Sequence, residues 1–470
     1  MAGEQHGGDR MAEADIAAIT ARLDRLPATR GIWHLVALLS IGGAFEFYDL
    51  FFTGYVVPGL VREGLLAHVR VGIFTGPAAF VAATFGGLFI GTIGFGFIAD
   101  RFGRRPIFTF SLLWYSLSTA IMAFQHTASG LLLWRLVAGL GIGVELVTID
   151  TYLAELVPKD LRGRAFAVNQ MVQFSVVPIV ALLAWQLVPR TVGGMAGWRV
   201  VVLIGASGAL FVWFLRRGLP ESPRWLAQHG RVAEAERITA RIEARVRADL
   251  AGAALPPPLA AAAPERVAKG AFIEIWRPPY RGRTIMLMVF QFFQTIGFYG
   301  FASWVPTLIA EQGIHLQGSL LYSFIIALAN PFGPMIAIAF ADRIERKWQI
   351  VGAALGIALA GLAFSVQRQV PALIFCGVVL TLCANVLSFA FHAYQSELYP
   401  TRIRARAVGF VYSWSRLSAV LVSFMIAFLL QWGGVAAVFV FIAGAMAMVI
   451  IAIGGFGPTT NGRQLEAISE

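Results

Sequence analysis

The hexapeptide DRFGRR, Asp100–Arg105, closes a long apolar stretch and recurs as DRIERK at 342–347, again after an apolar stretch. A second motif, ELVP at 155–158, recurs as ELYP at 397–400. Positions 100 and 342, and positions 155 and 397, differ by the same 242 residues. Two independent motifs at one period predict a duplicated chain with two homologous halves in the same orientation.

The composition places both halves in a membrane. The chain has 470 residues, of which 58% are hydrophobic and 13% are charged, whereas soluble domains carry about 25% charged residues. A spanning helix needs about 20 mostly apolar residues, and continuous apolar runs favour helices over barrel strands. We therefore expect an all-α membrane protein with twelve transmembrane helices in two parallel six-helix halves. The expected spans are 32–57, 71–99, 106–124, 131–154, 165–188, 198–215, 284–309, 318–341, 349–366, 371–395, 406–428 and 433–456.

The basic residues predict the topology. Thirty of the 37 Lys and Arg residues fall in the N-terminus, the even-numbered loops and the C-terminus, and five fall in the odd-numbered loops. Both termini are therefore expected in the cytoplasm, with the protein in the inner or plasma membrane, and the net charge of +11 does not require nucleic acid. The expected segments are a cytoplasmic N-terminus (1–31) with a short amphipathic helix on the membrane surface, a first bundle (32–215), a cytoplasmic linker with a helix (216–283), a second bundle (284–456) and a cytoplasmic tail (457–470).

Three motifs resemble those of a known superfamily. GFIADRFGRR at 96–105 is similar to the loop 2–3 signature of the major facilitator superfamily, and RLVAGLG at 135–141 is similar to its fourth-helix motif. PESPRWL at 220–226 is similar to a sequence typical of sugar porters. The resemblance runs from span one to span twelve. It implies a secondary transporter, not an enzyme, with a central cavity between two halves that rock.

A motif in span one resembles those of particular branches of this superfamily. FEFYD at 45–49 resembles the corresponding motif of metabolite:proton symporters, and also that of aromatic-acid:proton symporters and synaptic-vesicle-2-like proteins, although Glu46 and Phe47 depart from the latter version. GIGVE at 141–145 and Arg416 point to the same acid-transporting group. The segment 414–418 lacks the glycines that usually surround this arginine.

Intramembrane charges are candidates for function because a charge at mid-bilayer costs several kcal/mol. Glu46 and Asp49 share one face of span one, and two such acids cannot both ionise at low cost, so we expect the pair to carry a proton. The alternative is permanent neutralisation by a basic neighbour. Arg135 is expected beside Asp49 as a switch, or else as a static ion pair. Glu145 is assigned to the proton relay, although it or Asp150 could instead neutralise an arginine.

The C-terminal half has no acid within its spans, and its polar groups predict an anion site. A guanidinium binds a carboxylate in a bidentate manner, so we expect Arg416 to hold the substrate, with a packing or gating role as the alternative. His392 is expected to be a core histidine. The residues expected to complete the substrate site are Gln291, Gln294, Tyr299, Asn330 and Asn385.

The loop motifs predict gating. The resemblance implies that their charges latch the two halves while the cavity faces outward, through ion pairs that form in one state and break in the other. The C-terminal copy has Glu345 where the first copy has Gly103, so we expect that copy to be degenerate. The gating residues are Asp100, Arg101, Gly103, Arg104, Arg105, Glu155, Arg162, Asp342, Arg346 and Glu397.

These patterns predict proton-coupled symport of a small organic anion, a carboxylate or an aromatic acid, by alternating access in a monomer. The expected partners are the substrate, protons and the bilayer, with no nucleic acid, cofactor or metal. The sequence has no P-loop for nucleotide hydrolysis. Two alternatives remain: a transporter of a cationic, zwitterionic or sugar-like metabolite, and a membrane sensor that signals through residues 216–283.

Overall fold

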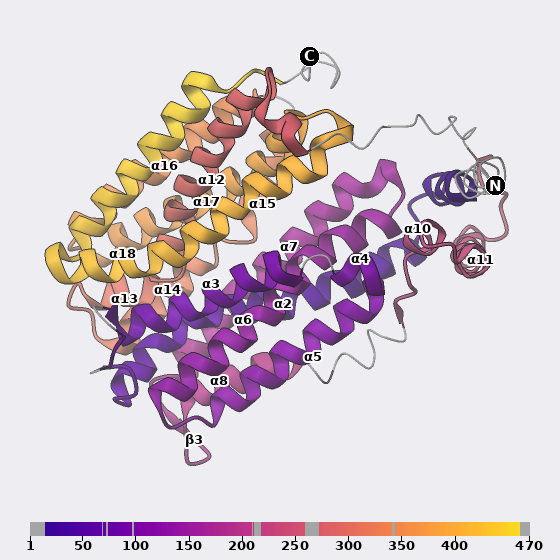
Figure 1. Ribbon diagram of the computed structural model, residues 1–470. Helices are drawn as coiled ribbons and strands as arrows, with labels where there is room; N and C mark the ends of the chain where they lie inside the picture. Colours follow the sequence, from indigo (N-terminus) through magenta and orange to yellow (C-terminus); the bar gives the residue numbers. More distant parts are fainter. Residues whose placement is uncertain are drawn as a thin grey trace.

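The fold consists of two helical bundles that lie side by side (Figure 1). This computed structural model describes residues 15–67, 69–71, 74–95, 98–208, 210, 218–258, 272–340 and 344–460. Long apolar helices suit a membrane because each backbone N–H and C=O group is satisfied within its own helix. The protein is therefore a multi-pass membrane protein.

The first bundle contains six spans and two short hairpins. Its helices are α2 (Arg30–Arg62), α3 (Gly76–Phe95), α4 (Ile98–Phe102), α5 (Arg104–Ala123), α6 (Ala128–Leu156), α7 (Lys159–Leu187) and α8 (Gly197–Ala206). The hairpins are β1 (Arg70–Val71) with β2 (Phe74–Thr75), and β3 (Thr191–Val192) with β4 (Met195–Ala196); both pairs are antiparallel. Span six begins with α8, and much of the rest of it lies outside the described residues.

The second bundle repeats this plan. Its helices are α12 (Tyr280–Ala302), α13 (Val305–Ala310), α14 (Leu316–Ala327), α15 (Phe332–Phe340), α16 (Arg346–Val366), α17 (Val370–Glu397) and α18 (Thr401–Val449), followed by the π-helix η2 (Ile450–Gly455). Helix α18 covers spans eleven and twelve, because the non-helical Gly434 (φ 64°) separates them. Helices α5 and α16 begin 242 residues apart, which confirms the predicted duplication.

Twelve spans result. Ten helices are long and apolar enough to cross a membrane; one of them, Arg406–Gly455, holds two spans, and the shorter Gly197–Ala206 begins another. The expectation of unbroken spans is wrong at two places. Span eight is interrupted between α14 and α15 because Pro331 has no N–H and disfavours helix at the residue before it. The helix of span seven ends at Ala302, and the separate helix α13 begins at Val305, with Pro306 in its first turn.

The second span begins later than expected. The sequence predicts its start at residue 71, but β1 and β2 occupy residues 70–75 and the helix starts at Gly76. A Cβ atom on Gly76 would lie 2.5 Å from the backbone oxygen of Leu66, so this corner accepts only glycine without a shift.

Helices outside the bundles gather at one end, next to the start of α2 (Figure 1). They are α10 (Pro223–Gln228) and α11 (Val232–Asp249); the short helix η1 (Phe272–Trp276) leads into α12. Residues 457–460 contact the start of α16, where the Lys347 ammonium donates to the carbonyl of Gly457 at 2.8 Å. We call this end of the molecule the termini side, and the other end the opposite side.

The amphipathic N-terminal segment does not present its apolar face outward. Residues 15–24 are helical, and residues 11–14 of the predicted helix lie outside the described part. Its apolar residues Ile19, Leu23 and Leu26 are buried. Arg22 and Arg25 donate to the Glu243 carboxylate of α11 at 2.8 and 2.7 Å. In the described residues the apolar face of this segment is therefore packed inside the protein, and ion pairs hold the segment on α11; its placement relative to the membrane stays a prediction.

Candidate functional site

The two halves close against each other on the opposite side. Helix α18 packs on α3, and α14 packs on α7. Spans one and seven come so close that a Cβ atom on Gly54 would lie 2.2 Å from the backbone oxygen of Ser303. Aromatic rings fill the remaining space, as in the pairs Phe85 with Tyr299, Phe174 with Phe298, and Trp185 with Phe324. The described residues therefore pack the two halves against each other at this end.

Two exposed polar side chains indicate that the space between the halves, the central cavity, opens on the termini side. Asp150 of α6 and His392 of α17 are both exposed although each lies in a spanning helix. The expectation that His392 is a core histidine is therefore wrong, although its Nδ1 lies 2.6 Å from the Ser388 carbonyl oxygen. Deeper in the membrane, Glu46, Glu145 and Arg135 are completely buried. The central cavity thus ends at a buried polar layer.

The first part of this layer is the ion pair between Asp49 and Arg135, which the sequence predicts and the structure confirms. The Arg135 guanidinium also donates to Thr84 Oγ1 at 2.8 Å, to Thr53 Oγ1 at 2.7 Å and to the Asp49 carbonyl at 2.8 Å. Thr119 donates to the second Asp49 carboxylate oxygen at 2.6 Å. Both charges are therefore paired and hydrogen-bonded, which offsets the desolvation of a buried pair.

The second part is a pair of carboxyl groups with few partners. Neither Glu46 carboxyl oxygen has a hydrogen-bond partner among the described residues, and one oxygen of Glu145 also has none. The other Glu145 oxygen accepts a long hydrogen bond of 3.5 Å from Ser111. Glu46 and Glu145 lie within electrostatic reach of each other. The structure therefore gives Glu46 and Asp49 different surroundings, although they share a helix face.

The third part is Arg416 in span eleven. It is 3% exposed, and within the described chain it has no carboxylate within 4 Å and its Nε has no hydrogen-bond partner. Its Nη2 donates to the Tyr412 hydroxyl at 3.2 Å, and its guanidinium lies 4.8 Å from the centre of the Tyr412 ring. Glu46 and Asp150 lie within electrostatic reach across the cavity. A buried guanidinium with so few partners is a strong candidate for binding an anion.

Aromatic side chains surround this polar layer. Tyr299 lies within electrostatic reach of Arg416 and contacts the rings of Phe85 and Phe298 at 4.7 and 5.0 Å between centroids. Phe391 stacks on His392 at 4.1 Å between ring centroids, and Tyr412 lies beside it. Ring faces near a guanidinium suit a flat solute that carries a negative charge.

The amide residues of the predicted substrate site divide into two groups. Gln291 donates to Gln395 at 2.7 Å, and Gln294 donates to Gln291 at 3.1 Å, so these amides join α12 to α17. Asn385 donates to Asn330 at 3.2 Å. These two asparagines line a cavity of about 20 Å³ at the break in span eight, where there is space for a water but not for a substrate.

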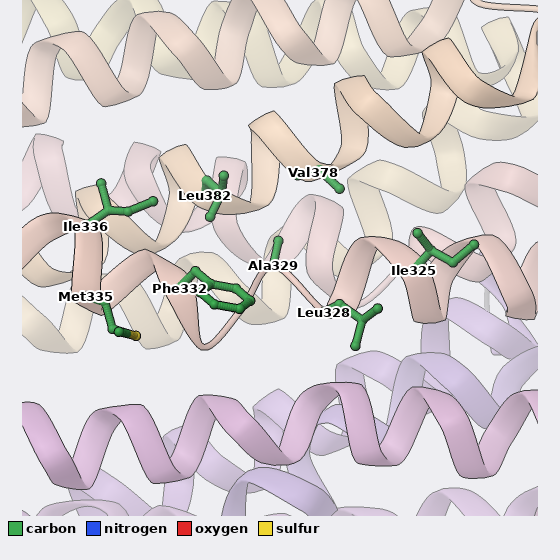
Figure 2. A pocket seen from close by; sticks show the side chains of 8 residues that line it. All are labelled: Ile325, Leu328, Ala329, Phe332, Met335, Ile336, Val378 and Leu382. Carbon is green, nitrogen blue, oxygen red and sulfur yellow. The ribbon is translucent and has the colours of Figure 1, made fainter.

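A larger cavity of about 650 Å³ lies beside the same break (Figure 2). All eight side chains drawn around it are apolar, and they come from α14, α15, α17 and the link between α14 and α15. Leu328, Phe332 and Met335 are each at least 45% exposed, so the cavity opens to the outside of the bundle. With no polar group to orient a polar solute, it suits lipid tails better than a substrate.

Three of the predicted gating residues of the first half, Arg104, Arg105 and Glu155, lie together at the termini side. Arg104 donates to both Glu155 oxygens, at 2.9 Å through Nη2 and at 3.3 Å through Nε. Glu221 accepts from the backbone N–H groups of Arg104 and Arg105 at 3.0 and 3.3 Å. Burial raises the pKa of the Glu221 carboxyl, although these backbone donors and that of Ser222 oppose the shift. The start of α5, the end of α6 and the loop after span six are thereby held together.

Gly103 is required at this corner. Its φ is +102°, a conformation that L side chains rarely adopt, and a Cβ atom would lie 2.4 Å from Glu221 Oε2. Arg162 lies 3.5 Å from Asp24, so it binds the N-terminal segment. Arg101 is exposed over the ring of its neighbour Phe102. For Asp100 the structure describes the backbone only, and Asp342 lies outside the described residues.

The second half repeats the ion pair. Arg346 pairs with Glu397, at positions 242 residues after Arg104 and Glu155. The expectation of a degenerate second copy is therefore wrong for this contact. Glu345, which stands where the first half has Gly103, does not prevent this pairing. It accepts a hydrogen bond from the backbone N–H of Thr460 at 2.7 Å. In this conformation Arg104 and Arg346 each pair with a glutamate of their own half. The central cavity is open on the termini side, where these pairs lie.

Several contributing residues were missed by the sequence reasoning. They include Thr53, Thr84 and Thr119 around the ion pair, Tyr412 beside Arg416, Gln395 in the amide network, and Glu221 at the loop. Hydroxyl residues within spans are too common to select from one sequence. Glu221 lies in the PESPRWL motif directly before the start of α10, and this motif was the available signal.

Two six-helix halves around a central polar layer define a secondary transporter of the major facilitator type. The sequence profile described as "Sugar (and other) transporter" matches residues 35–470, so the chain belongs to this family of membrane transporters.

Relatives span the whole chain. It is 29% identical over 465 residues to the inner membrane metabolite transport protein YdjE of Escherichia coli, which covers 96% of this chain and 98% of the relative. It is 26% identical over 454 residues to the niacin transporter NiaP of Acinetobacter baylyi, with 96% and 99% covered. The proton:xylose symporter XylE of E. coli, bound to 6-bromo-6-deoxy-D-glucose, superposes with a TM-score of 0.72 at 21% identity over 93% of this chain and 99% of that one. These proteins are transporters, and the chain is accordingly a transporter of metabolites.

Proposed function

We propose that the protein couples the movement of protons to the uptake of a small organic anion, an aromatic or aliphatic carboxylate. The observation that carries this proposal is Arg416, a buried guanidinium that faces the central cavity side without a carboxylate partner among the described residues. A buried charge of this kind is costly unless a ligand or a neighbour compensates it. A substrate carboxylate would supply that compensation through two parallel hydrogen bonds.

We assign the transported proton to Glu46, with Glu145 as its neighbour in the relay. An ionised carboxylate that is buried without a hydrogen-bond partner costs several kcal/mol, and Glu46 is 0% exposed with both oxygens unpartnered. Its charge would also attract Arg416, with which it interacts electrostatically. Proton loss from Glu46 would therefore offer Arg416 an internal partner and release the substrate anion.

The proposed cycle places the termini side in the cytoplasm. The distribution of basic residues supports this orientation, and the conformation described above is then the inward-facing one. Asp49 and Arg135 serve as the switch between this conformation and the outward-facing one. Opening of the opposite side separates Gly54 from Ser303, and the charges around Arg104 and Arg346 then latch the halves at the cytoplasmic side.

Two relatives support the substrate class and the coupling. One is named a niacin transporter, and niacin is a carboxylate on an aromatic ring. The structural neighbour is described as a proton:xylose symporter. The aromatic rings beside Arg416 favour the first of these substrate types for the present chain, because a ring face packs on a flat solute.

The test uses purified protein in liposomes with an imposed pH gradient. We expect accumulation of labelled nicotinate or benzoate when the outside is acidic, and no gradient-driven accumulation of nicotinamide, which has the same ring without the charge. Glu46→Gln should lose gradient-driven accumulation and retain exchange of labelled for unlabelled acid. Glu311→Gln, a change at an exposed loop carboxylate on the opposite side, is the matched control. Accumulation that ignores the pH gradient, or that survives in Glu46→Gln, would contradict the proton assignment.

Asp150 favours a second candidate, transport of an organic cation. It is an exposed carboxylate in the open cavity and could bind an ammonium group. In that case Asp150→Asn abolishes uptake of the cation and Arg416→Gln does not. The anion proposal predicts the reverse for nicotinate or benzoate.

A further inference from the structure

A separate basic pocket lies on the termini side, outside the central cavity. Its volume is about 230 Å³, and its walls come from the first turns of α2, the loop after span six, the start of α5 and one face of α11. Its basic lining residues are Arg105, Arg241 and Arg245, and its apolar floor includes Leu35, Leu219 and Ile242.

Two arginines of α11 form the outer wall of this pocket. Arg241 and Arg245 are four residues apart and therefore lie on one face of the helix, where like charges repel. Both are exposed, and neither has a carboxylate within 4 Å in the described part of the chain. The two acids of α11 nearest to these arginines in sequence are engaged elsewhere: Glu243 binds Arg22 and Arg25, and Asp249 accepts from the backbone N–H of Gly31 at 2.6 Å.

Close packing fixes the shape of the pocket. A Cβ atom on Gly31 would lie 3.0 Å from Asp249 Oδ2 and 3.1 Å from Arg245 Cγ, so α11 packs directly on the first turn of α2. On the other wall, the backbone of Arg105 is held by Glu221 at 3.3 Å. The three arginines are thereby kept around one space at the point where span one enters the membrane.

We propose that this pocket binds the phosphate headgroup of an acidic phospholipid from the adjacent leaflet. The basic side chains select a phosphate, and the apolar floor of Leu35, Leu219 and Ile242 suits the glycerol and the first carbons of the acyl chains. The start of α2 carries Trp33, a residue type typical of the membrane interface, at the level of the pocket. Basic pockets next to spanning helices commonly hold anionic lipid headgroups.

The test compares lipids on the whole protein. The protein is placed in nanodiscs of phosphatidylcholine, alone or mixed with phosphatidylglycerol, and retained lipid is counted by native mass spectrometry together with the thermal midpoint. We expect phosphatidylglycerol to be retained and to raise the midpoint. The change of each arginine, Arg241→Gln or Arg245→Gln, should weaken this binding about fivefold, and the double change about thirtyfold.

Matched variants separate binding from folding. Arg247→Gln removes an exposed arginine of the same helix that does not line the pocket, and it should leave lipid retention unchanged. Arg245→Lys retains the charge and should retain most of the binding. Equal retention of phosphatidylglycerol by the double variant and the wild type would overturn the proposal. Equal stabilisation by inorganic phosphate or glycerol 3-phosphate in phosphatidylcholine nanodiscs would also overturn it, and would indicate a site for a soluble anion instead.

Discussion

The molecule contains one buried arginine in the centre of each half, and their surroundings are opposite. Arg135 is completely buried, pairs with Asp49 and donates to Thr53 and Thr84. Arg416 is almost as buried, and its hydrogen-bond partners in the described residues are the hydroxyls of Tyr412 and Tyr299, with no carboxylate among them. The charge of Arg135 is compensated by groups of the protein itself, whereas the proposed function assigns the compensation of Arg416 to a bound anion. In the function proposed above, this difference separates Arg135, which holds and switches the fold, from Arg416, which binds the ligand.

The largest expected effect is a loss of stability on removal of Arg135, the arginine that is paired within the protein. Arg135→Gln leaves the Asp49 carboxylate buried without its charge partner, and breaking a buried pair costs about 3–5 kcal/mol. We expect a large fall in the free energy of unfolding, measured by chemical denaturation in detergent. The double variant Asp49→Asn with Arg135→Gln should recover much of this loss, because no charge is left unpaired. If the single and the double variant lose the same free energy of unfolding, Asp49 does not need Arg135 as its charge partner, and the contrast with Arg416 fails.

A smaller effect is expected at the hydroxyl that completes this pair. Thr119→Val retains the shape but removes the donor to Asp49, and an unsatisfied buried acceptor costs about 1–3 kcal/mol. Ser118→Ala, at the adjacent position where the hydroxyl donates only to the backbone oxygen of Trp114, is the control. A Thr119→Val protein as stable as the control would indicate that Asp49 does not need its second partner.

On the ligand side, Tyr412→Phe removes the hydroxyl that Arg416 donates to and retains the aromatic ring. We expect little change in stability and a change of about two- to tenfold in the affinity for a carboxylate, from the 0.5–1.5 kcal/mol of one hydrogen bond. Isothermal titration with nicotinate or benzoate measures it. A loss of folding in this variant would place Arg416 among the structural groups instead.

The smallest effect concerns the ion pairs of Glu243, a buried carboxylate whose partners Arg22 and Arg25 still reach solvent, with 28% and 12% of their side chains exposed. Burial opposes ionisation of Glu243, but hydrogen bonds from Arg22 and Arg25 outweigh it and lower the pKa of this carboxyl. Because the pKa is lowered in the folded state, the ion pairs stabilise the protein at pH values above the ordinary glutamate pKa. This contribution is lost as the pH falls through the pKa of the folded protein. Glu243→Gln should cost at most about 1 kcal/mol. The cost should disappear in acid, as measured by unfolding at a series of pH values.

Much of the fold could be predicted from the sequence, because length and apolar character fix the spans and two motifs fix the duplication. The break in span eight was missed although Pro331 stands in the middle of the apolar run. The contact between the N-terminal segment and α11 could not be predicted, since nothing local shows that Arg22 and Arg25 meet Glu243 more than 200 residues away.

The site was predicted in part. The Asp49–Arg135 pair follows from the cost of burying charge, which leaves few possible partners within the spans. The spacing of Glu46 and Asp49 predicts a shared face but not their different partners, because these come from α5 and α6. The 242-residue period places Arg346 and Glu397 at the positions of Arg104 and Glu155, so this second ion pair could have been predicted. It was not, because the second copy has Glu345 at the position of Gly103, which favours a degenerate copy.

The most direct test of the account is ligand-induced thermal stabilisation of the purified wild type and of Arg416→Gln by benzoate, nicotinate and nicotinamide at two pH values. A ligand that binds the folded protein raises its apparent stability by mass action. We predict that a carboxylate stabilises the wild type, more strongly at the lower pH, while nicotinamide does not, and that Arg416→Gln folds normally and loses the response. If Arg416→Gln retains the response to the acid, or if the variant fails to fold, then Arg416 is a structural arginine like Arg135 and the central claim is wrong.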